Sequence, residues 1–229
     1  MAQILPVDAV GDNCATAVVR RIYLKYHNRV ERTGANDDSL IYALNRWGNL
    51  PLTAPYCGTS IGFFVEQSGL KLVGITKAAM PLAWNWRKSE CIVWDVRNGW
   101  RSKARQLPAC DEIFVVLFRR SDGGYHVGVA LWFHGGLNFV TGQGNTSNWR
   151  ARAGGKADIN AVGTSLGFRN GTLYLPPKTY NVGRNKGLRQ QGFFVKETYQ
   201  QGNVIAIMAF RTNNKYQIPR GRPRKYQLW

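Results

Sequence analysis

Hydrophobic residues follow two different periods along the chain. In the first ninety residues they recur at every third or fourth position, which predicts amphipathic helices. One helix is expected over residues 13–31, and a second is expected to be capped by Asp37, Asp38 and Ser39 and to stop at Gly48. A third is expected to begin at Cys57 and to end at Gly69.

The apolar stretches after residue 90 are rich in β-branched and aromatic residues and are separated by glycine-containing turns. This pattern is typical of antiparallel strands with short connections. The expected strands are CIVWDV, EIFVVLFRR, YHVGVALWF, LNFVTG, GFFVKE and NVIAIMAFR. Residues 76–88 are expected to form a short helix or turn, and the glycine- and arginine-rich residues 150–190 long loops. Helices followed by an antiparallel sheet predict an α+β fold.

The length of 229 residues suits one large domain, or one domain with an appendage. We expect a catalytic core over residues 1–150, with a helical part at 12–90 and a sheet at 91–150. Residues 151–229 are expected to form a basic extension whose two strands complete the sheet, with a flexible tail at 215–229. The sequence contains no run of 18 apolar residues, so no membrane span is predicted. It begins without a basic cluster ahead of an apolar segment, so no signal peptide is expected.

The net charge of +18 is unevenly distributed. Residues 123–229 hold 15 Lys and Arg against 2 Asp and Glu, which gives +13 for this part. Such an excess suggests a polyanionic partner, which is nucleic acid, an anionic membrane surface or the phosphate-rich polymers of a bacterial envelope. The charge by itself does not choose among these partners.

Cys57 is the first candidate for chemistry, because a helix N-terminus favours a thiolate. The alternative is a buried, inert cysteine. The four cysteines show no spacing typical of a metal site, so no metal is expected. A chain of this length does not need disulfides, and the pairing of Cys14, Cys91 and Cys110 stays open.

A nucleophilic cysteine also needs a base and a group that orients the base. His126 begins a predicted strand, and Gln143 and Asn145 end the next one. If the two strands form a hairpin, these side chains lie beside His126. A core histidine and an ordinary polar loop are the alternatives.

Together the stretches PYCGTSIGFFVEQSGL, GYHVGVALWF and TGQGNTSN resemble the motifs of CHAP domains, which are cysteine, histidine-dependent amidohydrolases/peptidases of the papain-like NlpC/P60 group. The resemblance covers about residues 40–150. It implies a papain-like fold in which Cys57 begins a helix packed on the sheet that carries His126. It also implies a peptidoglycan hydrolase, either an N-acetylmuramoyl-L-alanine amidase or a peptide-bond endopeptidase. Gln143 stands where the family has Glu, so Gln143 and Asn145 are both candidates to orient the histidine.

The resemblance further suggests how a substrate is held. Backbone N–H groups at the start of the cysteine helix, together with Tyr56, are expected to stabilise an oxyanion. Trp84, Trp86 and Trp149 are expected to line a groove for sugar or peptide. No cofactor is implied.

Peptidoglycan and anionic envelope polymers are the expected partners, with an immunity protein if the chain is an interbacterial effector. We expect the protein to be made in the cytoplasm and to act at the cell wall or in the periplasm. A phage endolysin and an interbacterial effector fit this expectation equally well. Two other classes stay open. One is a non-enzymatic protein that binds nucleic acid through its basic half, where PRGRPRK resembles an AT-hook. The other is a papain-like toxin acting on a protein.

Overall fold

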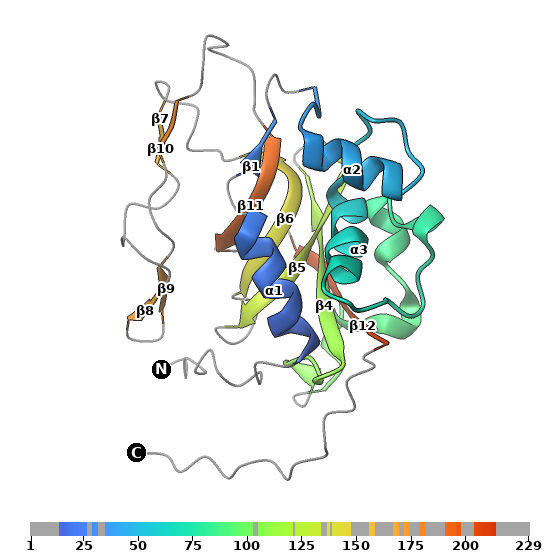
Figure 1. The fold of residues 1–229 in the computed structure, drawn as a ribbon. Helices are drawn as coiled ribbons and strands as arrows, with labels where there is room; N and C mark the ends of the chain where they lie inside the picture. Colours follow the sequence, from blue (N-terminus) through green and yellow to red (C-terminus); the bar gives the residue numbers. More distant parts are fainter. Residues whose placement is uncertain are drawn as a thin grey trace.

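A mixed architecture of helices and one large antiparallel sheet is seen in the computed structural model of the chain (Figure 1). The described residues are 14–26, 29–31, 35–102, 105–120, 122–133, 137, 139–147, 156–158, 167–169, 172–174, 179–181, 191–197 and 204–213. The sheet contains β1 (Arg29–Val30), β2 (Ile92–Asp95), β3 (Gly99–Trp100), β4 (Glu112–Arg119), β5 (Tyr125–Phe133), β6 (Phe139–Ser147), β11 (Gln191–Glu197) and β12 (Val204–Arg211).

The strands of this sheet lie in the order β1-β11-β6-β5-β4-β12-β2-β3, and every neighbouring pair is antiparallel. Strand β12 lies between β4 and β2, although it follows them by about a hundred positions. The sheet therefore uses strands from both sides of residue 150. As expected, β5 and β6 form a hairpin.

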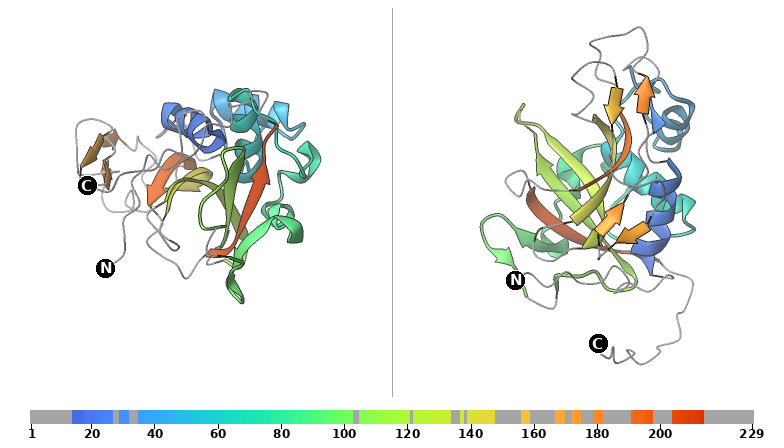
Figure 2. Two further views of the ribbon diagram at one scale, coloured as in Figure 1. Left: turned by 90° about the horizontal axis from the view of Figure 1, so that it is seen from below. Right: turned by 90° about the vertical axis from the view of Figure 1, so that its left-hand side faces the viewer.

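Three helices lie on one side of the curved sheet, where the first and third contact its strands and the second packs against the third (Figure 2). They are α1 (Ala15–Tyr26), α2 (Ser39–Trp47) and α3 (Cys57–Gln67). The first helix is shorter than predicted, because residues 29–30 pair with β11 as a strand instead of continuing the helix. The second begins as predicted, where the Asp38 carboxylate accepts a hydrogen bond from the Leu40 N–H at 2.7 Å.

Two apolar clusters, one on each face of the sheet, form the core. The helices cover the first cluster, whose strand residues include Val127, Val129 and Leu131. The second cluster contains strand residues that point to the opposite face, among them Phe114 and Val116 of β4 and Ala130 of β5. Because both faces are apolar, the central strands are hydrophobic nearly throughout, and alternation along them is weak in the sequence.

Short elements complete the described structure. Residues 76–88 form 3₁₀ turns, η2 (Lys77–Ala79) and η3 (Ala83–Trp86), followed by η4 (Ser89–Cys91). The expectation of long loops over 150–190 is wrong for twelve residues, which form two small sheets. These sheets pair β7 (Lys156–Asp158) with β10 (Thr179–Asn181) and β8 (Gly167–Arg169) with β9 (Thr172–Tyr174).

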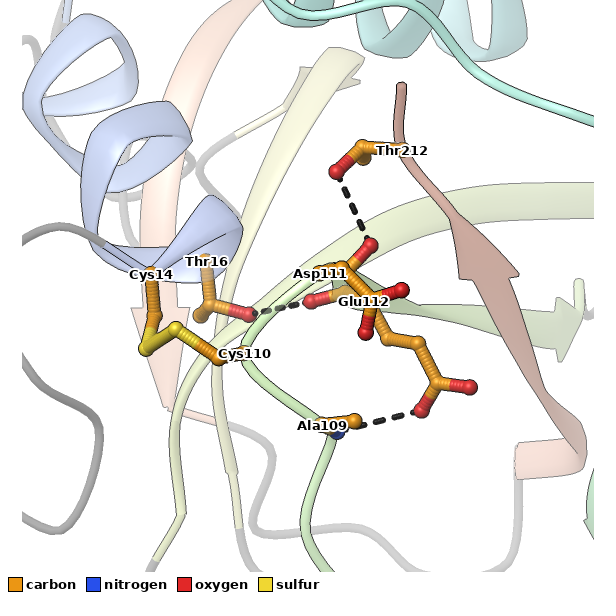
Figure 3. Close-up of a disulfide and its surroundings, with 7 residues drawn as sticks. All are labelled: Cys14, Thr16, Ala109, Cys110, Asp111, Glu112 and Thr212. Carbon is orange, nitrogen blue, oxygen red and sulfur yellow. Dashed lines mark hydrogen bonds between the residues drawn. A yellow bond between two sulfur atoms is a disulfide. The ribbon is translucent and has the colours of Figure 1, made fainter. Parts of the chain in front are cut away.

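A disulfide joins Cys14, just before α1, to Cys110, just before β4 (Figure 3). The two cysteines are 96 positions apart in the sequence, and the chain between them contains all of α2 and α3. Two hydrogen bonds strengthen the same junction. The Ala15 N–H donates to the Cys110 carbonyl at 2.8 Å, and the Thr16 hydroxyl donates to the Glu112 carbonyl at 3.2 Å.

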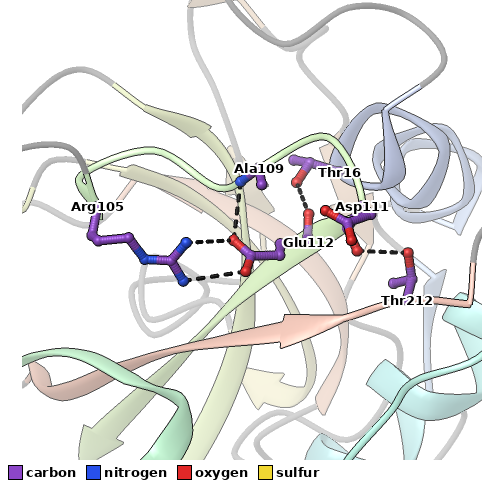
Figure 4. A network of polar contacts seen from close by, with 6 residues as sticks. All are labelled: Thr16, Arg105, Ala109, Asp111, Glu112 and Thr212. Atoms are coloured by element: carbon purple, nitrogen blue, oxygen red, sulfur yellow. Dashed lines mark hydrogen bonds and ion pairs between the residues drawn. The ribbon is translucent and has the colours of Figure 1, made fainter. Parts of the chain in front are cut away.

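The segment leading into β4 is also held by a buried carboxylate (Figure 4). Glu112 is 4% exposed and accepts two hydrogen bonds from the Arg105 guanidinium, at 3.1 and 3.2 Å. The Ala109 N–H donates to it as well. A buried charge is tolerated when it is paired and hydrogen-bonded in this way. The beginning of β4 is thus fixed to α1 on one side and to its own preceding loop on the other.

Candidate active site

Cys57 is the first residue of α3, as the sequence predicts. The helix start is pressed against the turn over residues 77–86, because a Cβ at Gly58 would collide with the Met80 carbonyl and would lie 2.6 Å from the Trp86 indole nitrogen. Only glycine fits next to the cysteine at this close approach. The turn therefore sets the position of the thiol.

The Cys57 thiol is buried, with 7% of the residue exposed. Burial raises the pKa of the thiol above its ordinary value. Backbone N–H groups of Val127 and Gly58, which hydrogen-bond the sulfur, act in the opposite direction, as does the positive charge of Arg120. Because burial is the largest effect, the thiol stays protonated near neutral pH unless a base accepts its proton.

His126 and Gln143 form the best-defined polar contact near this thiol. The His126 Nε2 lies 3.1 Å from the Gln143 Oε1. The amide of Gln143 is oriented by its own nitrogen, which donates to the Thr141 hydroxyl at 2.7 Å. An amide oxygen can only accept, so the imidazole Nε2 carries the hydrogen and Nδ1 is left as the basic nitrogen.

A glycine makes room for this pair. A Cβ at Gly128 would lie 2.8 Å from the Gln143 Cγ, so a larger residue there would displace the amide. Both His126 and Gln143 are 8% exposed. The histidine is therefore held by a buried amide, which fixes the orientation of its ring.

The thiol and the imidazole approach the same end of β5. Register pairing between β5 and β6 ends at Val129 and Gly142, so the first residues of β5 have no partner in β6. A strand N–H lies in the plane of the sheet. The hydrogen bond from the Val127 N–H therefore places the Cys57 sulfur at this edge of β5, one residue from His126.

The neighbours of Gln143 show which face of the sheet it uses. A Cβ at Gly142 would collide with the Tyr23 ring of α1, and one at Gly144 would collide with Ser60 of α3. These two positions face the helices, so Gln143 between them points to the other face. Cys57 thus reaches the strand edge from the helical side, and the His126–Gln143 pair reaches it from the opposite side.

Asn145 has a different role from Gln143. Its backbone is in the left-handed region, with φ +54°, which asparagine tolerates better than most residues. Its N–H hydrogen-bonds the Tyr56 hydroxyl, and its side-chain oxygen is buried without a partner among the described residues. Of the two candidates, the structure places Gln143 on the imidazole.

Two of the expected substrate-binding residues are core residues, which corrects the sequence analysis. Tyr56 is fully buried, and its hydroxyl donates to the Glu31 carboxylate at 3.2 Å, so it does not reach an oxyanion. Trp86 is also fully buried, with its indole N–H bonded to the Met80 carbonyl at 2.9 Å. Trp84 is 48% exposed. Trp149 lies outside the described residues.

With Tyr56 excluded, the backbone N–H groups at the helix start remain of the expected oxyanion donors. The first N–H groups of a helix have no partner within the helix. Those of Cys57 and Gly58 both point at the sulfur. Two further residues contribute to the site and were not expected from the sequence. The Thr141 hydroxyl holds the Gln143 amide, and the positive charge of Arg120 acts to lower the pKa of the Cys57 thiol. Thr141 lies two positions before Gln143 on the same face of β6, so strand alternation was the available signal.

No family model, curated protein or solved structure matches this chain. Within the described residues, no three His, Cys, Asp or Glu side chains are grouped so that they could hold a metal ion. None of the described helices has the length and apolar character needed to cross a membrane.

Proposed function

We propose that this protein is a cysteine-dependent amide hydrolase that cuts bacterial peptidoglycan. The observation that carries the proposal is the His126–Gln143 hydrogen bond at the same strand edge where the Val127 N–H touches the Cys57 sulfur. A nucleophile at a helix start, a base and an orienting group are the three parts that thiol acyl transfer requires. The likeness of the three motifs to CHAP domains supplies the substrate class.

The proposed reaction follows from these positions. His126 Nδ1 takes the thiol proton, and the Cys57 sulfur attacks the carbonyl carbon of an amide. The N–H groups of Cys57 and Gly58 stabilise the resulting oxyanion. The imidazolium then protonates the leaving amine, and water hydrolyses the thioester with His126 again as the base. Gln143 accepts the Nε2 hydrogen throughout and keeps the ring in one orientation.

The proposal is tested by incubating the protein with purified peptidoglycan. We expect new amino groups to appear and soluble fragments to be released, with mass spectrometry identifying the bond. Absence of cleavage, together with tight and sequence-selective binding of duplex DNA at physiological salt, would favour the nucleic-acid alternative. Cleavage of a folded protein but not of peptidoglycan would favour the toxin alternative.

Gln143→Ala is expected to lower kcat/KM by about 10- to 100-fold, because the imidazole loses the acceptor that orients it. Gln143→Glu is expected to keep the geometry and to move the acidic limb of the pH–rate profile to higher pH, since a carboxylate favours the imidazolium, which cannot take the thiol proton. The measurement is the pH–rate profile of each variant on one soluble muropeptide. Asn145→Ala is the matched control. A normal rate for Gln143→Ala with an inactive Asn145→Ala would assign the orienting role to Asn145.

We further propose that the basic half of the chain, residues 123–229, binds anionic envelope polymers. Its charge of +13 predicts an affinity that falls steeply with salt, because each contact releases counterions. Deleting residues 215–229, which lie outside the described residues, is expected to weaken binding to whole cells and to leave cleavage of small soluble substrates unchanged. Binding measured between 50 and about 200 mM salt checks this. A salt-independent affinity would contradict it.

A further inference from the structure

The turn next to the cysteine carries two tryptophans with opposite orientations. Trp86 points inward, where its indole nitrogen meets the Met80 carbonyl and would collide with any side chain at position 58. Trp84, two positions earlier in the same turn η3, points outward and is 48% exposed. One tryptophan therefore fixes the turn against the start of the nucleophile helix, and the other is held beside it in solvent.

Trp84 is paired with an exposed residue of the histidine strand. Its ring centroid lies 4.6 Å from that of Tyr125, at an interplanar angle of 39°. Tyr125 is 37% exposed and immediately precedes His126. The Arg87 guanidinium lies 5.5 Å from the Trp84 ring centroid. We call Trp84, Tyr125 and Arg87 the aromatic platform.

The aromatic platform is continuous with the candidate active site on both sides. Through Trp86 its turn touches Gly58, the residue after the nucleophile, and through Tyr125 it adjoins the base. A group resting on the platform therefore lies beside the bond that Cys57 attacks. Large aromatic rings are expensive to leave in water, and a paired, exposed set beside a reaction centre is typical of a ligand site.

We infer that the aromatic platform binds the sugar next to the cleaved bond, so that the enzyme cuts the amide between muramic acid and the first amino acid. This inference rests on the proposed function. An extended peptide is usually recognised through an open strand edge. At Tyr125 one edge is occupied, because the residue is paired with Arg119 of β4, and the platform itself presents ring faces and a guanidinium, not backbone groups, to a ligand. Ring faces instead suit the apolar C–H face of a pyranose, and Arg87 can donate hydrogen bonds to its acetamido and hydroxyl oxygens.

The first test is the identity of the product and the effect of Trp84. Digestion of peptidoglycan is expected to expose a new amine only on the amino acid that was joined to muramic acid. Trp84→Ala is expected to lower kcat/KM for a disaccharide-peptide by about 10-fold, mostly through KM, while Trp84→Phe retains most of it. Leu82→Ala is the matched control, since Leu82 is 64% exposed near the same turn and is not part of the platform. Cleavage within the peptide, with Trp84→Ala as active as wild type, overturns the inference.

The second test measures binding without cleavage, in the full chain carrying Cys57→Ala. Tryptophan fluorescence or calorimetry compares a disaccharide-tetrapeptide with the same tetrapeptide lacking sugar. We expect about 10-fold tighter binding of the glycosylated probe, and loss of this difference on adding Trp84→Ala but not Leu82→Ala. Equal binding of the two probes overturns the inference. If the wild type cuts no wall substrate, the proposed function fails, and this arm still decides whether the platform binds sugar.

Discussion

Cys57→Ala is expected to abolish hydrolysis of purified peptidoglycan, with a loss of at least about 10³-fold in rate. The variant keeps the helix start and the N–H groups around it, and it lacks only the sulfur that would attack the carbonyl. A single buried sulfur is a small deletion, so the free energy of unfolding should fall by only about 1 kcal/mol. Release of new amino groups measures the activity, and urea unfolding measures the stability.

Cys91→Ala is the control for this prediction. Cys91 is the other free cysteine among the described residues, and it is partly exposed in η4. Burial also raises the pKa of its thiol, but no N–H groups of a helix start are directed at it. We expect normal activity from Cys91→Ala. If iodoacetamide inactivates the enzyme by labelling Cys91, while Cys57→Ala remains active, the nucleophile is misplaced.

Replacing both Cys14 and Cys110 by alanine is expected to lower the free energy of unfolding by about 4 to 5 kcal/mol. The two cysteines are 96 positions apart, and a cross-link of that span removes much of the freedom of the unfolded chain. The measurement is urea unfolding of the oxidised wild type and of the double variant.

A reducing agent provides the control. It should shift the unfolding midpoint of the wild type to that of the double variant and leave the variant itself unchanged. Two chains that unfold at the same urea concentration under oxidising conditions would show that the thiols are not joined in solution. The disulfide and the nucleophile are separate, so the double variant is expected to retain activity wherever it is folded.

Local sequence patterns were sufficient for the elements that carry the candidate site. The helix from Cys57 and the hairpin that aligns His126 with Gln143 both follow from the spacing of apolar residues and glycines. The orientation of single side chains in turns did not follow. Tyr56 points inward because Glu31, 25 positions earlier, accepts its hydroxyl hydrogen. Trp84 and Trp86 have the same local sequence context, so the sequence does not show which one is buried. The structure distinguishes them, because the indole nitrogen of Trp86 lies against Gly58.

Pairings between distant segments could not be predicted from the sequence either. The strand order and the Cys14–Cys110 disulfide depend on which distant segments meet, and no local period encodes that. The end of α1 is a related case. Residues 29–30 fit a helix by pattern, and pairing with β11 overrides that preference.

The interior position of β12 in the sheet has a consequence for synthesis on the ribosome. One edge of β4 pairs with β5, which follows directly in the sequence. The other edge pairs with β12, whose first residue comes 85 positions after Arg119. At about 5–20 residues per second, that edge stays open for several seconds in the nascent chain. Unpaired edges of apolar strands pair readily with strands of other chains, so a chaperone would bind the nascent chain during this interval. Cys57, His126 and Gln143 are all translated before β12, and so the reactive groups exist for a time in a chain whose sheet is not yet closed around them.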